Sequence, residues 1–323
     1  MSEADARERH RKHVVRLSRP GAALSVGAPT STTLNPRWFR ERDGVPVPRA
    51  ARIDLHNRLI STELAASSQA KYERFAIITA GPPGAGKGTV LDRVLQRRRS
   101  DFLVIDPDVF KHHLLQEALD DGSYHSWIKP DSVRAAEAGG EEFDPLELSA
   151  LVHAESSMLA KNLRRRALAD GRNIVVDTVL SSASSAFALC SELQNNDYSA
   201  EILDVEVPFE LSAQRIDERW QRSFDQAREY GLGLGGRWVP SEYTREVFAG
   251  PSGKSRSEHV AKVLANGCPI VRRYRVHRTV AGNVDVAGHD LEPHGQWSAG
   301  WTVDKRREVS GGPLTNAIHD AAE

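Results

Sequence analysis

Short apolar runs alternate with longer amphipathic segments over most of the chain. Five runs have the composition of buried strands, and they cover residues 75–81, 101–106, 173–178, 200–208 and 268–278. The segments between them place apolar residues at helical spacing. Strands that are apolar throughout and alternate with helices are typical of a parallel sheet covered by helices on both faces. The pattern therefore predicts an α/β fold.

The longest amphipathic segment carries its own start and stop signals. It covers residues 144–171, where Asp144 is a candidate N-cap, Pro145 falls in the first turn and Gly171 follows the last turn. A second segment of this kind covers residues 209–231. We expect both segments to be helical.

The two ends of the chain lack this alternation. Residues 1–50 are rich in Pro, Gly, Ser and Thr and show no sustained period, which predicts an irregular, partly disordered extension. Residues 281–323 predict a loose tail without regular structure. The sequence thus places one domain at residues 51–280, between two appendages.

Composition and charge narrow the class of protein. Of the 323 residues, 40% are hydrophobic and 27% are charged, which suits a soluble protein with a buried core. The formal net charge of -1 argues against a globally basic nucleic-acid binder and still allows a local basic cleft. No stretch approaches the roughly 20 apolar residues of a membrane span. We therefore expect a cytoplasmic protein without membrane contact.

The two cysteines do not form a recognisable motif. Cys190 and Cys268 lie far apart in the sequence and lack the spacing of metal ligands. We interpret them as reduced thiols, as in most cytosolic proteins.

The stretch "TAGPPGAGKGT" follows the first apolar run and precedes an amphipathic segment. Gly81, Gly86 and Lys87 fit the spacing G-x-x-x-x-G-K in the strand–loop–helix context that this motif requires. Glycines bring backbone N–H groups close to phosphate oxygens, and the start of the following helix adds its free N–H groups. The stretch therefore predicts a phosphate loop for ATP, with these binding residues: Gly81, Gly84, Ala85, Gly86, Lys87, Gly88 and Thr89.

One position of the loop departs from the usual motif. Gly88 stands where a Ser or Thr normally binds Mg²⁺, and the hydroxyl comes one residue later, at Thr89. We expect carboxylates and water to hold the metal instead, because Mg²⁺ gives up its water ligands reluctantly.

Acidic residues follow two of the predicted strands. Asp106 and Asp108 come after the second run, and Asp177 ends the third. Ligands of parallel sheets bind beyond the carboxyl ends of the strands. Asp108 is a candidate base for an acceptor hydroxyl, and Asp177 is a candidate holder of Mg²⁺ through water. Asp106 fits either role, or that of a helix cap.

Arginines near the γ-phosphate would stabilise the charge that develops during phosphoryl transfer. Arg215, Arg219 and Arg222 share one face of the segment 209–231. For Arg215 and Arg222 we favour a solvated face with acidic partners. Arg237 lies in "GLGLGGRWVP", whose glycines predict a loop able to close over a ligand.

Six motifs, in order along the chain, make the sequence resemble the zeta toxin family of kinases: "GPPGAGKGT", "VIDPDVFK", "HAESS", "GRNIVVDT", "VPFELSAQRIDER" and "GGRWVP". The likeness covers residues 75–248. It implies a P-loop kinase that uses ATP and Mg²⁺. The best-known members phosphorylate the amino-sugar part of UDP-N-acetylglucosamine, and several are toxins held by a small antitoxin protein.

The resemblance also implies roles for single residues. By position, Lys87 matches the phosphate-loop lysine and Asp108 the base that faces the acceptor hydroxyl. Asp177 matches the acidic residue at the end of the next strand. Arg219 and Arg237 match the two arginines that reach the phosphates.

Some positions depart from the family pattern, and they bear on the acceptor more than on ATP. Thr178 and Val179 follow Asp177 where the family often has Gly-Thr. A glutamate that contacts the sugar nucleotide would fall near Lys161, and the nearest acidic residue is Glu155. The polar segment 114–145 is expected to shape the acceptor pocket, with His125, Trp127 and Lys129 as unranked contacts.

The sequence as a whole predicts an ATP-dependent kinase that phosphorylates a hydroxyl of a small molecule, such as a UDP-amino sugar. Two alternatives stay open. One is a switch or binding module that holds ATP without phosphorylating an acceptor. The other is a kinase for nucleic-acid ends, for which the basic triplets in "LQRRR" and "NLRRRAL" are weak support.

Overall fold

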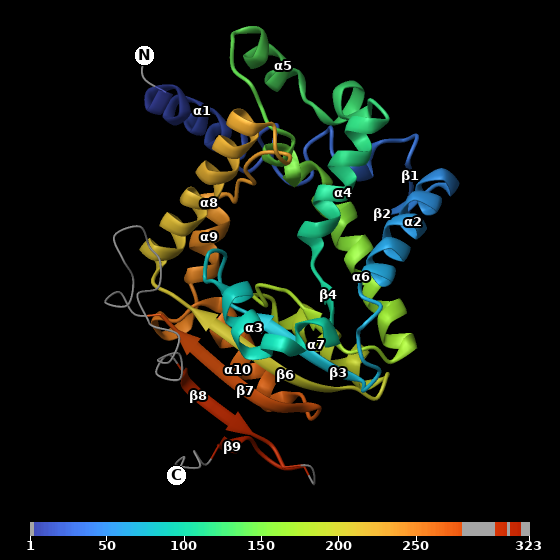
Figure 1. Ribbon diagram of the computed structural model, residues 1–323, viewed down its shortest axis with the longest axis vertical. Helices are drawn as coiled ribbons and strands as arrows, with labels where there is room; N and C mark the ends of the chain where they lie inside the picture. Colours follow the sequence, from blue (N-terminus) through green and yellow to red (C-terminus); the bar gives the residue numbers. More distant parts are fainter. Residues whose placement is uncertain (1–2, 280–300, 309–310, 318–323) are drawn as a thin grey trace. The chain divides into compact units, whose positions relative to one another are not determined.

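The computed structural model describes residues 3–279, 301–308 and 311–317. The chain forms two compact units, and each is built from several stretches of sequence. Within the described residues, the first unit comprises residues 3–66, 106–163 and 217–242, and the second comprises residues 67–105, 164–216, 243–279, 301–308 and 311–317. Elements are labelled as in Figure 1.

The second unit contains the sheet (Figure 1). Its described strands follow the order β4-β5-β3-β6-β7-β8-β9. The first five in this order are parallel, and β8 and β9 are antiparallel to their neighbours. The bounds are β3 (Phe75–Ala80), β4 (Leu103–Ile105), β5 (Ile174–Val176), β6 (Ser199–Glu206), β7 (Val271–Arg278), β8 (Trp301–Arg306) and β9 (Thr315–Asn316).

All five predicted strands are therefore confirmed, as is the α/β fold with a mostly parallel sheet. The tail is different from the expectation. Strands β8 and β9 lie within residues 281–323, for which the sequence predicted no regular structure, so that prediction is wrong for these two segments. Residues 281–300, 309–310 and 318–323 of the expected tail lie outside the described residues.

Helices cover both faces of this sheet. Helix α3 (Lys87–Leu95) lies in the crossover from β3 to β4. Helix α7 (Ala183–Gln194) lies in the crossover from β5 to β6, and α10 (Arg256–Gly267) in the one from β6 to β7. The first crossover runs across the sheet in the opposite direction to the other two. Because parallel crossovers are right-handed, α3 lies on one face, and α7 and α10 lie on the other, where they contact each other. The apolar core under α3 includes Leu91, Leu203 and Val205. The unit also contains η2 (Gln96–Asp101), η5 (Pro251–Gly253) and most of α9 (Ser241–Phe248).

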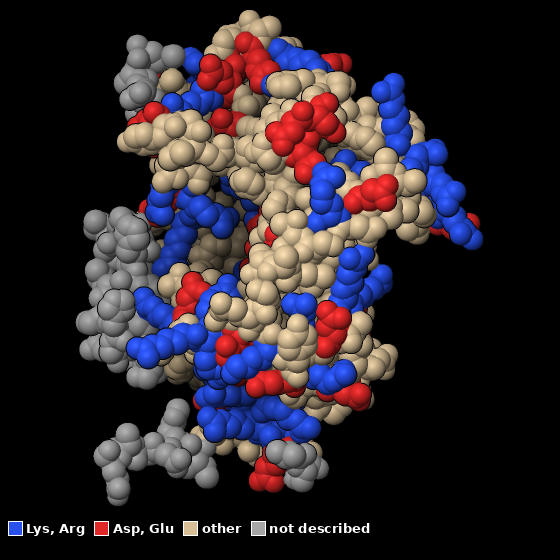
Figure 2. Space-filling view, turned by 45° about the vertical axis from the view of Figure 1, so that its right-hand side comes forward, with Lys and Arg blue, Asp and Glu red and all other residues tan. Residues whose placement is uncertain are grey.

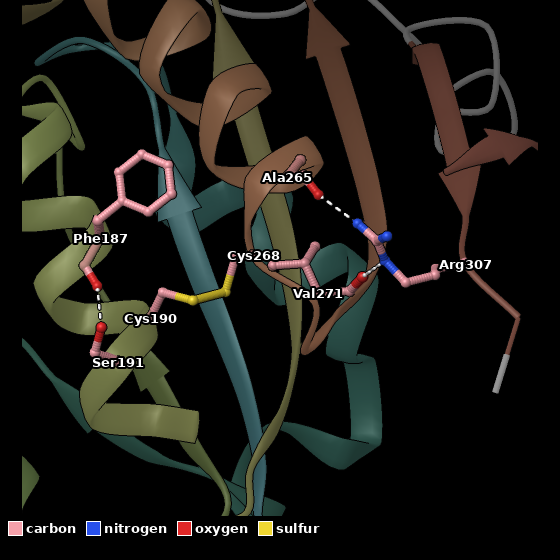
Figure 3. Close-up of a disulfide and its surroundings, with 7 residues drawn as sticks. All are labelled: Phe187, Cys190, Ser191, Ala265, Cys268, Val271 and Arg307. Atoms are coloured by element: carbon pink, nitrogen blue, oxygen red, sulfur yellow. Dashed lines mark hydrogen bonds between the residues drawn. A yellow bond between two sulfur atoms is a disulfide. The ribbon is translucent and has the colours of Figure 1, made fainter. Parts of the chain in front are cut away.

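A disulfide joins the two helices of the second face. Cys190 on α7 and Cys268, directly after α10, are bonded, with Cα atoms 6.2 Å apart (Figure 3). The reading of these residues as reduced thiols is therefore wrong. Close by, the Arg307 guanidinium donates to the carbonyl oxygens of Ala265 (2.8 Å) and Val271 (3.1 Å), which fastens the end of β8 to the same corner.

The first unit is mainly helical. Its elements are α1 (Glu3–Leu17), η1 (Thr32–Leu34), β1 (Phe39–Arg42), β2 (Val45–Pro48), α2 (Ala50–Ala66), α4 (Pro107–Asp120), η3 (Tyr124–Ile128), α5 (Asp131–Ala138), η4 (Pro145–Val152), and parts of α6 (His153–Asp170) and α8 (Phe209–Tyr230). The strands β1 and β2 form an antiparallel hairpin. The first fifty residues, expected to be irregular, thus contain a helix and a hairpin.

The predicted helix at residues 144–171 is confirmed with one refinement. It begins as the 3-10 helix η4 and continues as α6. Asp144 and Glu147 form a capping box at its start, and Gly171 follows its end with φ +78°. No helix among the described residues has both the length and the apolar character needed to cross a membrane.

Candidate active site

The glycine loop of the second unit runs from β3 to α3 and is shaped by close backbone contacts. Gly81 has φ +130°, and a Cβ there would collide with the backbone carbonyl oxygen of Val205 on β6. Gly84 has φ +73°, and a Cβ there would lie 2.6 Å from the carbonyl oxygen of Ser212. Because only glycine fits these two positions, the loop conformation is fixed by its sequence.

Side chains brace the same loop. Lys87, the first residue of α3, donates from Nζ to the carbonyl oxygens of Gly81 (3.0 Å) and Pro82 (3.3 Å). The Ser212 hydroxyl donates to Pro83 O at 2.6 Å. Arg215, which is partly exposed, donates to Ala85 O at 3.4 Å, so its guanidinium also contacts the loop.

Asp177 lies next to the loop strand. It directly follows β5, which pairs with β3, and its Oδ1 accepts a hydrogen bond from the Thr79 hydroxyl at 2.7 Å. The Thr79 oxygen in turn accepts from the Thr178 backbone N–H at 3.1 Å. Asp177 is thus held beside the strand that leads into Gly81. No group of three or more His, Cys, Asp or Glu side chains suited to a metal occurs among the described residues.

The first unit contains a separate group of ionisable residues, which we call the Asp108 cluster: Asp106, Asp108, Lys111, His153, Arg219 and Arg237. Asp106 is the N-cap of α4, and its Oδ1 accepts from the Asp108 backbone N–H at 2.8 Å. Of the roles considered for Asp106, the helix cap is the one with a direct contact. The Asp108 carboxylate forms ion pairs with Arg237 and, at 3.1 Å, with the Lys111 ammonium.

Lys111 is the most unusual member of the Asp108 cluster. Its side chain is 8% exposed, against 39% for Asp108. Burial lowers the pKa of Lys111 to about 8; the Asp106 carboxylate opposes this shift, and the Arg219 cation adds to it. Burial, together with the Lys111 charge, also lowers the pKa of His153 to about 4. Lys111 is therefore protonated and His153 neutral at pH 7.

The two units thus divide the residues singled out in the sequence. Asp108, Arg219 and Arg237 belong to the Asp108 cluster of the first unit. The glycine loop, Lys87 and Asp177 belong to the second unit.

Two candidate acceptor contacts, Glu155 and Lys129, have structural roles. Glu155 is fully buried and accepts from Arg52 (2.5 Å) and His56 (2.7 Å). Lys129 is buried and pairs with Glu137 at 2.7 Å. These ion pairs account for both side chains, so they are poor candidates for binding an acceptor.

The sequence reading missed Lys111 and His153, although both lie inside motifs that it quoted. A spacing of three residues from Asp108 would have placed Lys111 on the same helix face. His153 carries no comparable signal, because its neighbours in the Asp108 cluster are distant in sequence.

A buried strand, a glycine-rich loop and a helix that begins at the loop lysine, set in a mostly parallel sheet, define the fold as that of a P-loop kinase. A model of the zeta toxin family matches residues 61–138 and 112–278. The chain therefore belongs to the zeta toxin family, which confirms the resemblance drawn from the sequence.

Two solved structures resemble this chain at low identity. The structure of AvrRxo1-ORF1:AvrRxo1-ORF2 with sulphate ions has 19% identity and a TM-score of 0.50, with coverage of 72% of this chain and 65% of that chain. The chain thus spans less than two thirds of that relative. A structure of the PezAT toxin-antitoxin system of Streptococcus pneumoniae has 14% identity, a TM-score of 0.45, and coverage of 70% and 77%. A comparison with curated proteins found no match.

Proposed function

We propose that the chain transfers the γ-phosphoryl group of ATP to a hydroxyl of a small molecule, with UDP-N-acetylglucosamine as the first acceptor to test. The observation that carries the proposal is the loop at residues 81–87, which holds Lys87 at the start of α3 with its Nζ over the loop carbonyls. Bound phosphate would compete for this ammonium group and for the N–H groups at the helix start. Family membership supports the same reaction class.

Asp108 is the residue that we assign as base. Its carboxylate is partly exposed and is oriented by a backbone cap and two cations, so it can accept a proton from a positioned hydroxyl. Arg219 and Arg237 would stabilise charge on the transferred group. The reaction would need little covalent chemistry from the protein, because positioning and charge neutralisation supply most of the catalysis.

The residues present fit a magnesium ion. Mg²⁺ usually keeps several waters and binds one or two carboxylates together with substrate phosphates. A single carboxylate, Asp177, beside the loop strand is such a donor set. We propose that Asp177 holds Mg²⁺ through water, where the ion would neutralise phosphate charge.

Direct measurement of phosphoryl transfer tests the proposal. Labelled ATP with UDP-N-acetylglucosamine, and with a panel of other sugar nucleotides and nucleosides, should give a labelled product. Asp108→Asn should lower transfer by about a hundredfold or more while ATP still binds. The matched control is Asp131→Asn, a fully exposed carboxylate on α5. Unchanged transfer in Asp108→Asn would remove Asp108 from its role, and ATP binding without any acceptor would favour an ATP-dependent switch.

The structure offers little support for a nucleic-acid kinase. Lys and Arg side chains gather on the sheet unit around β7 and β8 (Figure 2). Of the arginines on β7, Arg273 pairs with Asp304 at 2.6 Å and the buried Arg275 pairs with Glu201, so both charges are neutralised. Steeply salt-dependent binding of oligonucleotides would reverse this judgement.

Family membership also supports a toxin role with a small antitoxin protein as partner. Induced expression of the wild-type chain should then arrest growth, and Asp108→Asn should relieve the arrest. A small protein encoded next to this chain should suppress the arrest by binding it. Unimpaired growth with the active enzyme would argue against a toxin.

A further inference from the structure

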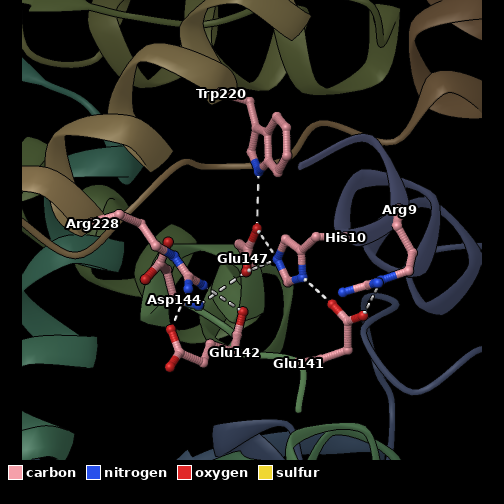
Figure 4. Close-up of polar contacts among 8 residues, drawn as sticks. All are labelled: Arg9, His10, Glu141, Glu142, Asp144, Glu147, Trp220 and Arg228. Atoms are coloured by element: carbon pink, nitrogen blue, oxygen red, sulfur yellow. Dashed lines mark hydrogen bonds and ion pairs between the residues drawn. The ribbon is translucent and has the colours of Figure 1, made fainter. Parts of the chain in front are cut away.

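Glu147 is a buried carboxylate that ties three elements of the first unit together (Figure 4). Its side chain is fully buried and accepts hydrogen bonds from His10 of α1 (3.0 Å) and Trp220 of α8 (3.0 Å). It also accepts from the Asp144 backbone N–H at 2.9 Å, as part of the capping box that starts η4. A buried carboxylate with three donors is fixed in position, and it fixes its donors in turn.

His10 completes this arrangement as a cation. Its Nδ1 faces Glu141 at 3.1 Å and its Nε2 faces Glu147 at 3.0 Å, so both ring nitrogens meet carboxylate oxygens (Figure 4). Burial alone would lower the pKa of His10, but the hydrogen bonds to Glu147 and Glu141 raise it above its ordinary value. The His10 ring also packs on Phe143 and Phe224, with ring centres 4.9 Å and 5.3 Å apart, respectively.

The same network supports the segment that carries Arg237. Leu146 donates from its backbone N–H to Leu234 O at 2.9 Å. A Cβ at Gly235 would collide with the Asp144 side chain, and a Cβ at Gly236 would collide with the Trp220 backbone. The Trp238 ring meets Trp220 edge to face, with centres 5.9 Å apart. Both neighbours of Arg237 in the sequence therefore rest on Trp220.

Arg219 is linked to the network by sequence, since it directly precedes Trp220 on α8. Trp220 is fully buried, and its indole N–H donates to Glu147, so Glu147 holds the side chain of the residue that follows Arg219. The two arginines of the Asp108 cluster therefore share one anchor.

We propose that Glu147, with His10 as its counter-ion, is a positioning residue for Arg219 and Arg237. The inference rests on the proposed kinase function, because it assigns Glu147 the task of aiming two arginines of that reaction. It makes α1, part of an extension that the sequence treated as an appendage, a component of the catalytic apparatus. Misplacement of catalytic groups by about 1 Å can cost up to a hundredfold in rate.

The first test measures structure without needing activity. Hydrogen–deuterium exchange of the full chain should show faster exchange at residues 232–238 in Glu147→Gln and in His10→Gln, by about tenfold. The matched control is Arg7→Ala, which breaks the 2.7 Å ion pair between α1 and Asp225 of α8 without touching Glu147. It should leave residues 232–238 unchanged. If Glu147→Gln does not fold, the exchange rate of His10→Gln at residues 232–238 still tests the proposal, because this change alters the same hydrogen bond at its donor.

The second test separates positioning from general stability. Glu147→Gln should lower kcat about tenfold to a hundredfold with the KM for ATP nearly unchanged. In a background that carries both Arg219→Ala and Arg237→Ala, the same change should have a much smaller effect on kcat, because both of its targets are gone. A full multiplicative effect in that background, or unchanged exchange at residues 232–238, would overturn the proposal. A wild-type chain without transferase activity would instead sink the proposed function, and the exchange result would still decide the positioning role.

Discussion

The phosphate loop and the Asp108 cluster hold their charged side chains in different ways. The loop is one continuous stretch whose shape is imposed by the backbone, as at Gly81, where only glycine fits against Val205. The Asp108 cluster draws residues from α4, α6, α8 and the segment around Arg237, and it is held by ion pairs and burial. A backbone-defined loop should tolerate changes of charge and salt but no added Cβ. A cluster held by charge should be sensitive to changes of charge and salt and should tolerate an added Cβ.

The largest effect that would test this contrast is expected for Gly81→Ala. A methyl group at φ +130° would be strained and would overlap the Val205 carbonyl oxygen, so the loop must move away from β6. We expect ATP binding to weaken by about a thousandfold or more. Isothermal titration with ATP, alongside circular dichroism to verify folding, measures the change.

Gly88→Ala is the matched control within the same loop. Gly88 lies in the first turn of α3, has no positive φ, and a Cβ there would meet no atom within 4 Å. We expect ATP affinity to stay within about threefold and stability to rise slightly, because Ala is the better helix former. Equal losses in Gly81→Ala and Gly88→Ala would show that the backbone of Gly81 is not the limiting feature.

The same contrast explains what the sequence could and could not predict. The loop was predicted because its signal is local: a buried strand, glycines at fixed spacing and a helix. The central strands were predicted because they are apolar throughout. The strand β8, "WTVDKR", was missed because it is short and largely polar, and its place in the sheet comes from pairing with β7.

For the Asp108 cluster, the sequence identified single residues without their contacts. Asp108 was singled out by its place after a strand, Arg219 by its helix face and Arg237 by its glycine-rich segment, and the family resemblance then implied their roles. The spacing of three residues on α4 signals the contact between Lys111 and Asp108. The burial of Lys111 depends on elements that are far apart in the chain, and no short motif records it. The disulfide was missed for a similar reason, since Cys190 and Cys268 are 78 residues apart.

Reduction of this disulfide should produce the next largest effect, on stability. A cross-link that closes a loop of 78 residues contributes about 4 kcal/mol in the chain-entropy account. We expect the unfolding midpoint to fall in reductant, and Cys190→Ser with Cys268→Ser to reproduce that fall without reductant. Calorimetry with and without reductant measures it. Identical melting in both conditions would show that the bond does not brace the sheet unit.

The first unit should instead lose stability in acid, because Glu155 anchors it through charge. Burial alone would raise the pKa of Glu155, but hydrogen bonds from His56 and Arg52 lower it from 4.5 to about 2. A carboxyl group with a lowered pKa in the folded state stabilises above its unfolded pKa, and this contribution is lost as pH falls from about 4.5 toward 2. We expect Glu155→Gln to lower the free energy of unfolding by about 3 kcal/mol at pH 7.

Urea titrations at pH 7 and at pH 3 check this expectation. The difference between wild type and Glu155→Gln should shrink in acid, because the wild type then loses its own ion pair. Asp43→Asn, at an exposed carboxylate of the β1–β2 turn, is the control and should change neither value. A difference that stays constant with pH would mean that Glu155 acts by packing and not by charge.

The smallest effect is expected for Lys111→Met, which should raise the free energy of unfolding where the preceding changes lower it. The pKa of Lys111 falls from 10.5 to about 8 because burial disfavours the ammonium form. The protonated lysine therefore costs stability at pH 7, and that cost is relieved as pH rises from about 8 to 10.5. We expect Lys111→Met to raise the free energy of unfolding by about 2 kcal/mol at pH 7 and by much less at pH 10.

Phosphoryl transfer should fall, because Asp108 loses one of its two cations. Lys161→Met, at an exposed lysine on α6, should change neither property. A less stable Lys111→Met protein at pH 7 would mean that the ion pair with Asp108 stabilises the fold by more than the burial of the ammonium group destabilises it. Lys111 would then hold the Asp108 cluster together instead of lowering its stability.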